Sequence, residues 1–150
     1  MRLRILAVAA ALATVVSLAA PAHADIGTHC SGWRWTSIGT VQSACYDRTV
    51  DYRARGRGRA YYDGPYSVDQ MNIGVSLQRS EDGTSWTTIK SASCGWTGDN
   101  IATDTPGNVC LTGAVDVDAS SLYRSRVFTL LFFSNGVIWQ SGFTYSPMTT

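Results

Sequence analysis

The sequence contains few of the side chains on which enzymes depend. Two histidines occur among 150 residues, and only His29 lies outside the N-terminal leader described below. No Gly-x-Ser-x-Gly elbow, His-Glu-x-x-His zinc motif or glycine-rich phosphate loop is present. A glycosidase that uses carboxylates alone needs two of them in one cleft, and the pair Asp116 and Asp118 is better explained as a solvated strand end. We therefore predict that the protein is not an enzyme.

Metal-ligand spacing and an excess of positive charge are also missing. Cys-x-x-Cys does not occur, and the acidic residues between 98 and 108 lack the Asp-x-Asp-x-Asp-Gly spacing of a calcium loop. The chain has 12 basic and 11 acidic residues. Loss of Arg2 and Arg4 with the leader gives 10 − 11 = −1. We expect no cofactor, no metal and no nucleic-acid partner.

Long apolar runs are absent except at the N-terminus. Two arginines open the chain, an apolar stretch follows over residues 5–20, and Ala22-His23-Ala24 is a small-x-small cleavage site. The pattern predicts a signal peptide over residues 1–24 and one secreted, extracellular domain over residues 25–150. A membrane anchor is the alternative, but the apolar stretch is short for one. The longest later apolar run, 127–133, is too short to span a membrane and is interrupted by Thr129.

Four cysteines lie in the expected mature chain, and an even number in an exported protein indicates two disulfides. They are Cys30, Cys45, Cys94 and Cys110. Three pairings are possible. We favour Cys30–Cys45 and Cys94–Cys110, because each closes a local loop of similar length. A loop of roughly 16 residues contributes about 3 kcal/mol in the chain-entropy account.

The stretch from Ile73 to Trp96 has the pattern of a β-hairpin. Apolar Ile73, Val75 and Leu77 alternate with small or polar residues, which predicts a strand with one buried face. Glu81-Asp82-Gly83-Thr84 supplies the turn. Trp86 and Ile89 fall on the expected return strand, three residues apart, so they share a face only if the strand contains a bulge.

Similar short patterns occur along most of the mature chain. Strands are expected between Cys30 and Cys45, over residues 45–55 with Val50 and Tyr52 on one face, and over residues 110–117, with a loop over residues 95–109. The last hairpin, around Asn135-Gly136, has a first strand that is apolar on both faces and therefore central or covered. Seven to eight short strands without a convincing helix predict an all-β antiparallel sandwich or squat barrel.

Four arginines at alternate positions stand out between residues 53 and 59. Arg53, Arg55, Arg57 and Arg59 would lie on one face of a strand. The favoured interpretation is a solvated edge strand, whose charges discourage pairing with another chain. An anion or polyanion contact and a flexible loop are the alternatives.

The order of strand and turn signals resembles a fibronectin type III or immunoglobulin-like domain. The resemblance covers roughly residues 73–145 and includes Leu77-Gln78-Arg79-Ser80, Trp86-Thr87-Thr88-Ile89 and Leu122-Tyr123-Arg124-Ser125-Arg126-Val127. It implies a seven-stranded scaffold that binds a partner rather than catalysing a reaction. We accordingly expect a secreted, non-catalytic protein that recognises a protein or glycan partner. The candidate binding residues are Trp33, Arg34, Trp35, Tyr61, Tyr62 and Trp96.

A shorter resemblance suggests an alternative function. Trp33-Arg34-Trp35, between two nearby cysteines, is similar to the Trp-Arg-Tyr triplet of tendamistat-type α-amylase inhibitors, which are secreted β-sandwiches with two disulfides. That resemblance implies an inhibitor of a secreted hydrolase. A third possibility is a structural cell-surface protein that self-associates through the second apolar face of the strand over residues 123–133.

Overall fold

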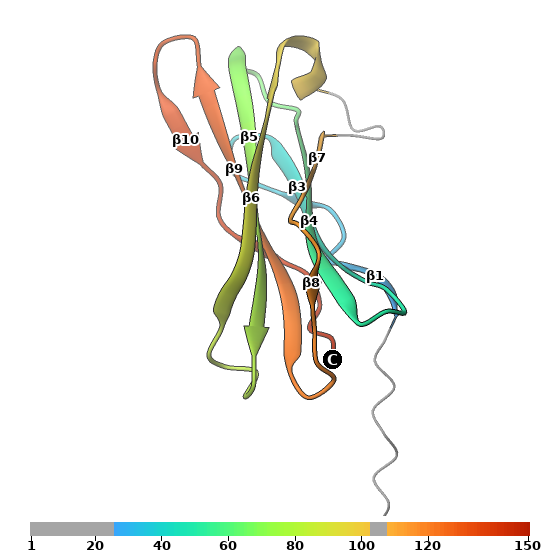
Figure 1. The fold of residues 1–150 in the computed structure, drawn as a ribbon. Coiled ribbons are helices and arrows are strands. Elements are labelled where there is room, and N and C mark those ends of the chain that lie inside the picture. Colours follow the sequence, from blue (N-terminus) through green and yellow to red (C-terminus); the bar gives the residue numbers. More distant parts are fainter. Residues whose placement is uncertain (1–25, 103–107) are drawn as a thin grey trace, which may run out of the picture.

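The computed structural model describes residues 26–102 and 108–150, and in them the chain is all-β. Eleven strands form two antiparallel sheets, and one short 3-10 helix, η1 (Gly98–Ile101), follows the sixth strand (Figure 1). The predicted signal peptide lies outside the described residues. No helix in the described part of the chain is long and apolar enough to cross a membrane.

The first sheet has the strand order β1-β3-β4-β7, and two short strands pair with its inner members. Its strands are β1 (Gly27–Cys30), β2 (Arg34–Trp35), β3 (Thr40–Arg48), β4 (Arg53–Tyr62), β7 (Asn108–Leu111) and β8 (Val115–Asp116). β2 pairs with β3, and β8 pairs with β4. β4 therefore has neighbours on both sides.

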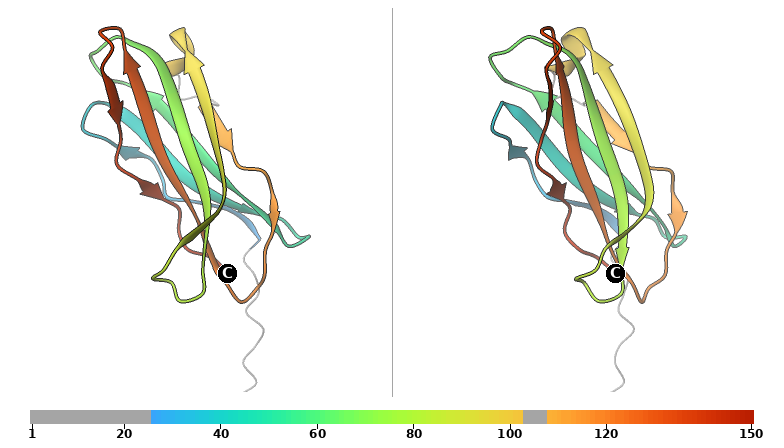
Figure 2. Two further views of the ribbon diagram at one scale, coloured as in Figure 1. Left: turned by 60° about the vertical axis from the view of Figure 1, so that its left-hand side comes forward. Right: turned by 90° about the vertical axis from the view of Figure 1, so that its left-hand side faces the viewer.

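The second sheet has the order β10-β9-β5-β6, with β11 paired to β9. Its strands are β5 (Val68–Ser80), β6 (Thr87–Thr97), β9 (Leu122–Phe133), β10 (Ile138–Gln140) and β11 (Thr144–Tyr145). β9 lies between β5 and the last two strands, as expected for a strand that is apolar on both faces. Figure 2 shows the two sheets as separate layers.

The number of strands was predicted too low because several are very short. A strand of two residues, such as β2, β8 or β11, contains no alternation that a sequence pattern can reveal. The strand expected over residues 110–117 is divided into β7 and β8, because Thr112 leaves the ladder. Its hydroxyl accepts a hydrogen bond from the backbone N–H of Gly56, while its own N–H donates to the Gly56 carbonyl.

Two other boundaries differ from the sequence prediction. The strand expected over residues 45–55 ends at Arg48, and Val50 and Tyr52 lie exposed in the turn to β4. Tyr52 has a φ of 58°, which no strand residue adopts. The loop expected to begin at residue 95 begins later, because Trp96 belongs to β6. Alternating polarity continues through residues 45–53 and conceals the turn.

The central hairpin is confirmed, and its return strand contains a bulge. Ile73, Val75 and Leu77 are fully buried. Leu77 lies opposite Lys90 and Gln78 opposite Thr88, so Ile89 is the extra residue in β6. Trp86 precedes the strand instead of belonging to it, and its indole N–H donates to the Gly83 carbonyl in the turn.

The main buried cluster draws on both sheets. Ala44 and Ala60 from the first sheet pack with Met71, Ile73 and Val127 from the second. The inward positions of β4 carry only small residues before Tyr62, which are Ala54, Gly56, Gly58 and Ala60. A Cβ atom at position 58 would lie 2.9 Å from Ile73 Cγ2 and 3.1 Å from Val127 Cγ2. The small residues therefore let the second sheet approach β4 closely.

Both disulfides have the expected pairing. Cys30–Cys45 joins two directly opposed residues of β1 and β3. Cys94–Cys110 joins β6 to β7, which lie at the ends of the two sheet orders. The second disulfide thus links the two sheets along one side of the domain.

Candidate binding surface

The arginines of β4 form a ladder on the solvent-facing side of the first sheet. Their side chains are exposed or half-buried, whereas the intervening alanines and glycines are buried. β4 is an interior strand, so the prediction of an edge strand was wrong. Whether a strand is interior or at an edge depends on pairing with residues distant in sequence, which the local pattern does not reveal. Because β4 has no open edge, the arginines do not serve to prevent pairing with another chain, and their clustering needs another explanation.

Two carboxylates form ion pairs with arginines of the ladder. Asp47 accepts from Arg55 Nε at 3.2 Å and lies 3.1 Å from Arg57 Nη2, and its side chain is only 9% exposed. Asp116 lies 3.6 Å from Arg53 and is 95% exposed, so that pair is weak. Arg59 forms no ion pair with a described residue. Four cations against two carboxylates leave the ladder with two uncompensated positive charges.

Two exposed tryptophans and a half-buried tyrosine lie at the Arg59 end of the ladder. The Trp33 and Tyr61 rings meet edge to face, with centroids 5.4 Å apart. The Arg59 guanidinium carbon lies 4.8 Å from the centre of the Trp33 ring. Trp35 is 64% exposed. It lies opposite Val41, which is itself opposite Tyr61, so the side chains of Trp35 and Tyr61 lie on the same outer face of the sheet. We call Trp33, Trp35, Tyr61 and Arg59 the aromatic cluster.

The segment that carries the two tryptophans is anchored at both ends. At its start, the Cys30–Cys45 disulfide joins it to β3, and Ser31 exchanges hydrogen bonds with the backbone of Ala44. At its end, the N–H of Thr36 donates to the carbonyl of Thr40. β2 pairs with β3 between these anchors. The cluster is therefore held on a fixed backbone before any partner arrives.

The remaining predicted residues lie elsewhere. Arg34 is exposed but lies opposite Gln42, on the other face of the strand from Trp35. It lines a shallow groove of about 230 Å³. Tyr62 is buried in the core, where its hydroxyl accepts from the N–H of Tyr66. Trp96 lies opposite Met71 on the inward side of the second sheet and packs against the core.

A second group of arginines and rings, which the sequence analysis missed, covers the outer face of the second sheet. The Arg124 guanidinium carbon lies 3.9 Å from the Trp86 ring centre and 4.3 Å from that of Tyr145. Its Nε donates to Gln78 Oε1, and burial lowers its pKa. Arg126 lies over Phe143 in the same way. Two rings flank Arg124, so this cation is part of the packing of the second sheet.

The outer side of β9 is partly covered by the chain itself. The Phe128 ring lies on Gly74 and would contact any Cβ placed there at 2.3 Å. Its other neighbour is Phe143, 5.8 Å away and edge to face. Aromatic cover of a strand glycine stabilises the sheet within one chain. Phe128, one of the apolar residues on this face, is thus packed against residues of its own chain.

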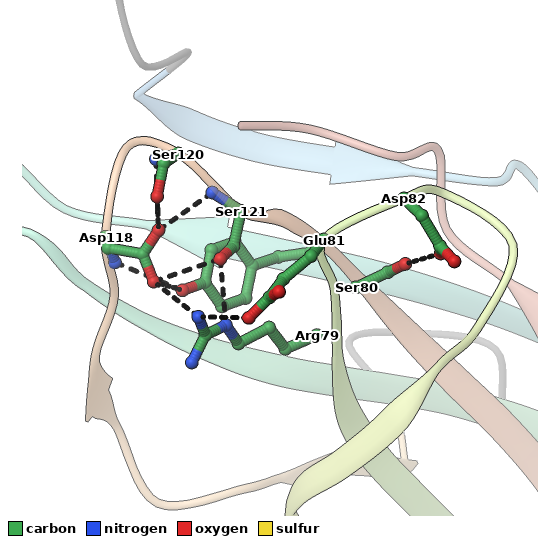
Figure 3. Close-up of polar contacts among 8 residues, drawn as sticks. Arg79, Ser80, Glu81, Asp82, Asp118, Ser120 and Ser121 are labelled. Atoms are coloured by element: carbon green, nitrogen blue, oxygen red, sulfur yellow. Dashed lines mark hydrogen bonds and ion pairs between the residues drawn. The ribbon is translucent and has the colours of Figure 1, made fainter.

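Asp118 belongs to a turn, and Figure 3 shows the donors that surround it. Its carboxylate accepts from the N–H and hydroxyl groups of Ser120 and Ser121 and from the Tyr123 hydroxyl. The hydrogen bond from the Ser120 hydroxyl is the main reason that its pKa lies well below the ordinary value. Arg79 bridges Asp118 and Glu81, at 3.5 and 3.2 Å. This carboxylate holds a turn together and stays ionised, so it suits neither acid nor base catalysis.

Comparison with known proteins found no match: no protein-family model, no curated protein and no solved structure is significantly similar to this chain. The function must therefore be inferred from the residues and their geometry.

Proposed function

We propose that the two sheets form an immunoglobulin-like sandwich. In this assignment β3, β4 and β7 take the places of strands A, B and E, while β5, β9 and β10 take those of C, F and G. β6, beside β5, occupies the position of C′. Tyr123, near the start of β9, supports the assignment, because its hydroxyl accepts a hydrogen bond from the N–H of Asp118, five residues earlier. A tyrosine in this position at the corner before strand F is a hallmark of such sandwiches.

We further propose that the protein is exported and acts as a non-catalytic binding protein, with a protein or glycan as its partner. The observation that carries this proposal is the aromatic cluster, with Trp33 and Trp35 43% and 64% exposed beside Arg59. Tryptophan, tyrosine and arginine are the residues most often responsible for binding energy at interfaces. Large rings exposed on a rigid sheet also lose little conformational entropy when a partner covers them.

Retention of the mature chain by a panel of ligands tests this function. The panel contains insoluble glycans, cell-wall material and immobilised secreted hydrolases. We expect retention by at least one member, and a loss of about tenfold or more in affinity when Trp35 is replaced by alanine, since a buried interface tryptophan is worth 2 kcal/mol or more. Retention that is equal for the wild type and W35A would contradict the assignment of the surface.

The second candidate is an inhibitor of a secreted hydrolase such as an α-amylase. The exposure of Trp33-Arg34-Trp35 on a disulfide-anchored segment favours it, because a constrained loop can enter an active site at low entropic cost. The assay is amylase activity with increasing amounts of the mature chain. Inhibition that disappears in R34A supports this function, whereas full activity at a large excess of the chain excludes it for the enzymes tested.

A further inference from the structure

We propose that the partner of this surface is an acidic polysaccharide, whose sugar rings lie on the aromatic cluster and whose acidic groups contact the arginine ladder. This inference rests on the proposed binding function and names the chemistry of its partner. The cluster and the ladder share one face, and Arg59 belongs to both. A ligand that combines flat, apolar sugar faces with anionic groups matches both parts at once.

The ladder has the geometry of a track for a linear polymer. Alternate residues of a strand are spaced by about 6.6 Å, so the four arginines extend over roughly 20 Å. A groove of about 300 Å³, lined by Thr28, Asp47, Arg53, Arg55 and Arg57 among others, runs beside them. A polymer with acidic groups along its length can contact several of these cations together, whereas a single small anion can contact one or two.

The guanidinium groups of the ladder are partly exposed and suit oxygen anions. The Arg53, Arg55 and Arg57 side chains are 50%, 46% and 27% exposed. Arg59 lies over the Trp33 ring, so its positive charge is held next to the aromatic cluster. All four cations are arginine, although the chain also has Lys90, and the guanidinium fork matches a carboxylate or sulfate in a bidentate manner.

The charge balance favours an acidic glycan over a nucleic acid. Asp47 and Asp116 lie within the ladder and leave an excess of only two positive charges. Nucleic-acid affinity depends on the neutralisation of many closely spaced phosphates, which these carboxylates would repel. A polysaccharide has more widely spaced charges, so the two carboxylates repel it less. Stacking of its sugar rings on Trp33 and Tyr61 would add to its affinity.

The experiment compares pairs of polymers that differ only in charge. The mature chain is tested by affinity electrophoresis against polygalacturonate and its methyl-esterified form, and against dextran sulfate and dextran. We expect binding to at least one acidic member, tenfold or more weaker binding to its uncharged counterpart, and weakening by added salt. Which acidic member binds distinguishes carboxylate from sulfate as the recognised group.

Single substitutions locate the contact. R59Q should weaken binding to the acidic polymer about tenfold, as expected for one lost charge-assisted contact. K90Q, which removes the same charge from an exposed position on β6, should change it less than twofold. Thermal unfolding of both variants checks that R59Q remains folded. Equal effects of R59Q and K90Q would refute the ladder as the site.

The remaining outcomes separate this inference from the function on which it rests. If neither acidic polymer binds but a neutral glycan or a protein is retained in a Trp35-dependent manner, the acidic partner is wrong and the binding function stands. If nothing in either panel is retained, both are wrong. Tighter binding to single-stranded oligo(dT) than to either acidic polymer would assign the ladder to nucleic acid and overturn the inference.

Discussion

Replacement of Asp47 by asparagine should lower the free energy of unfolding and, at the same time, raise the affinity of the arginine ladder for an acidic polymer. Asp47 is nearly buried and accepts from Thr28 Oγ1 at 2.9 Å, and it pairs with Arg55 and Arg57 at 3.2 and 3.1 Å. Asparagine keeps an oxygen acceptor of the same size but removes the charge. The substitution therefore tests the electrostatic role of this side chain with little change in its shape.

The expected cost is about 2 kcal/mol in the free energy of unfolding. Hydrogen bonds to charged groups contribute roughly 1.5–3 kcal/mol each. The two pairs must be discounted, because the Arg55 and Arg57 side chains are 46% and 27% exposed and are partly hydrated. With a urea m value of about 1.5 kcal/mol/M, the midpoint should fall by roughly 1–1.5 M. Tryptophan fluorescence during urea unfolding measures it.

D116N is the matched control. Asp116 pairs with Arg53 from an almost fully exposed position, so its loss should cost less than about 0.5 kcal/mol. Both variants increase the net charge of the ladder by one, and both should bind the acidic polymer more tightly than the wild type does. If D47N and D116N unfold at the same urea concentration, Asp47 does not stabilise the ladder as described.

Two further predictions concern the fold. G58A should lower the free energy of unfolding by about 1–3 kcal/mol, because its Cβ would meet Ile73 and Val127 across the core. G142A is the control: a Cβ atom at position 142 would meet open space, so this substitution should leave the free energy of unfolding nearly unchanged. Equal melting temperatures of G58A and G142A would contradict the close approach of the two sheets at Gly58. The pKa of Asp118 is lowered in the folded state, so its contribution to stability is complete above pH 4 or so and is lost as the pH falls further. Urea unfolding between pH 7 and 2 should show a shallower decline for D118N than for the wild type, and parallel curves would contradict this role.

Local features of the fold were predictable from local residues. The β5–β6 hairpin followed from the alternation at Ile73, Val75 and Leu77 and from its Asp-Gly turn, and both are present. The disulfides followed from loop lengths, and both pairings are confirmed. The arginines do share one face, because alternation in a strand depends only on neighbouring residues.

Features that depend on long-range pairing were not predictable in this way. β4 is interior because β7 and β8, more than forty residues later, pair with it. The contact between Trp33 and Arg59 likewise requires the arrangement of β2, β3 and β4. One available signal was missed: Tyr61 has the same parity as the arginines and is therefore on the outer face, whereas Tyr62 has the parity of Ala60 and is buried.

The most direct test of the central claim is the affinity of W35A and I138A for whichever partner the wild type retains. Trp35 and Ile138 are 64% and 61% exposed, on the first and second sheet respectively. Both should fold like the wild type, since neither belongs to the buried core. If the outer face of the first sheet is the binding surface, W35A should lose affinity by about tenfold or more and I138A by less than twofold. The reverse order, or equal affinities, would place the binding surface elsewhere.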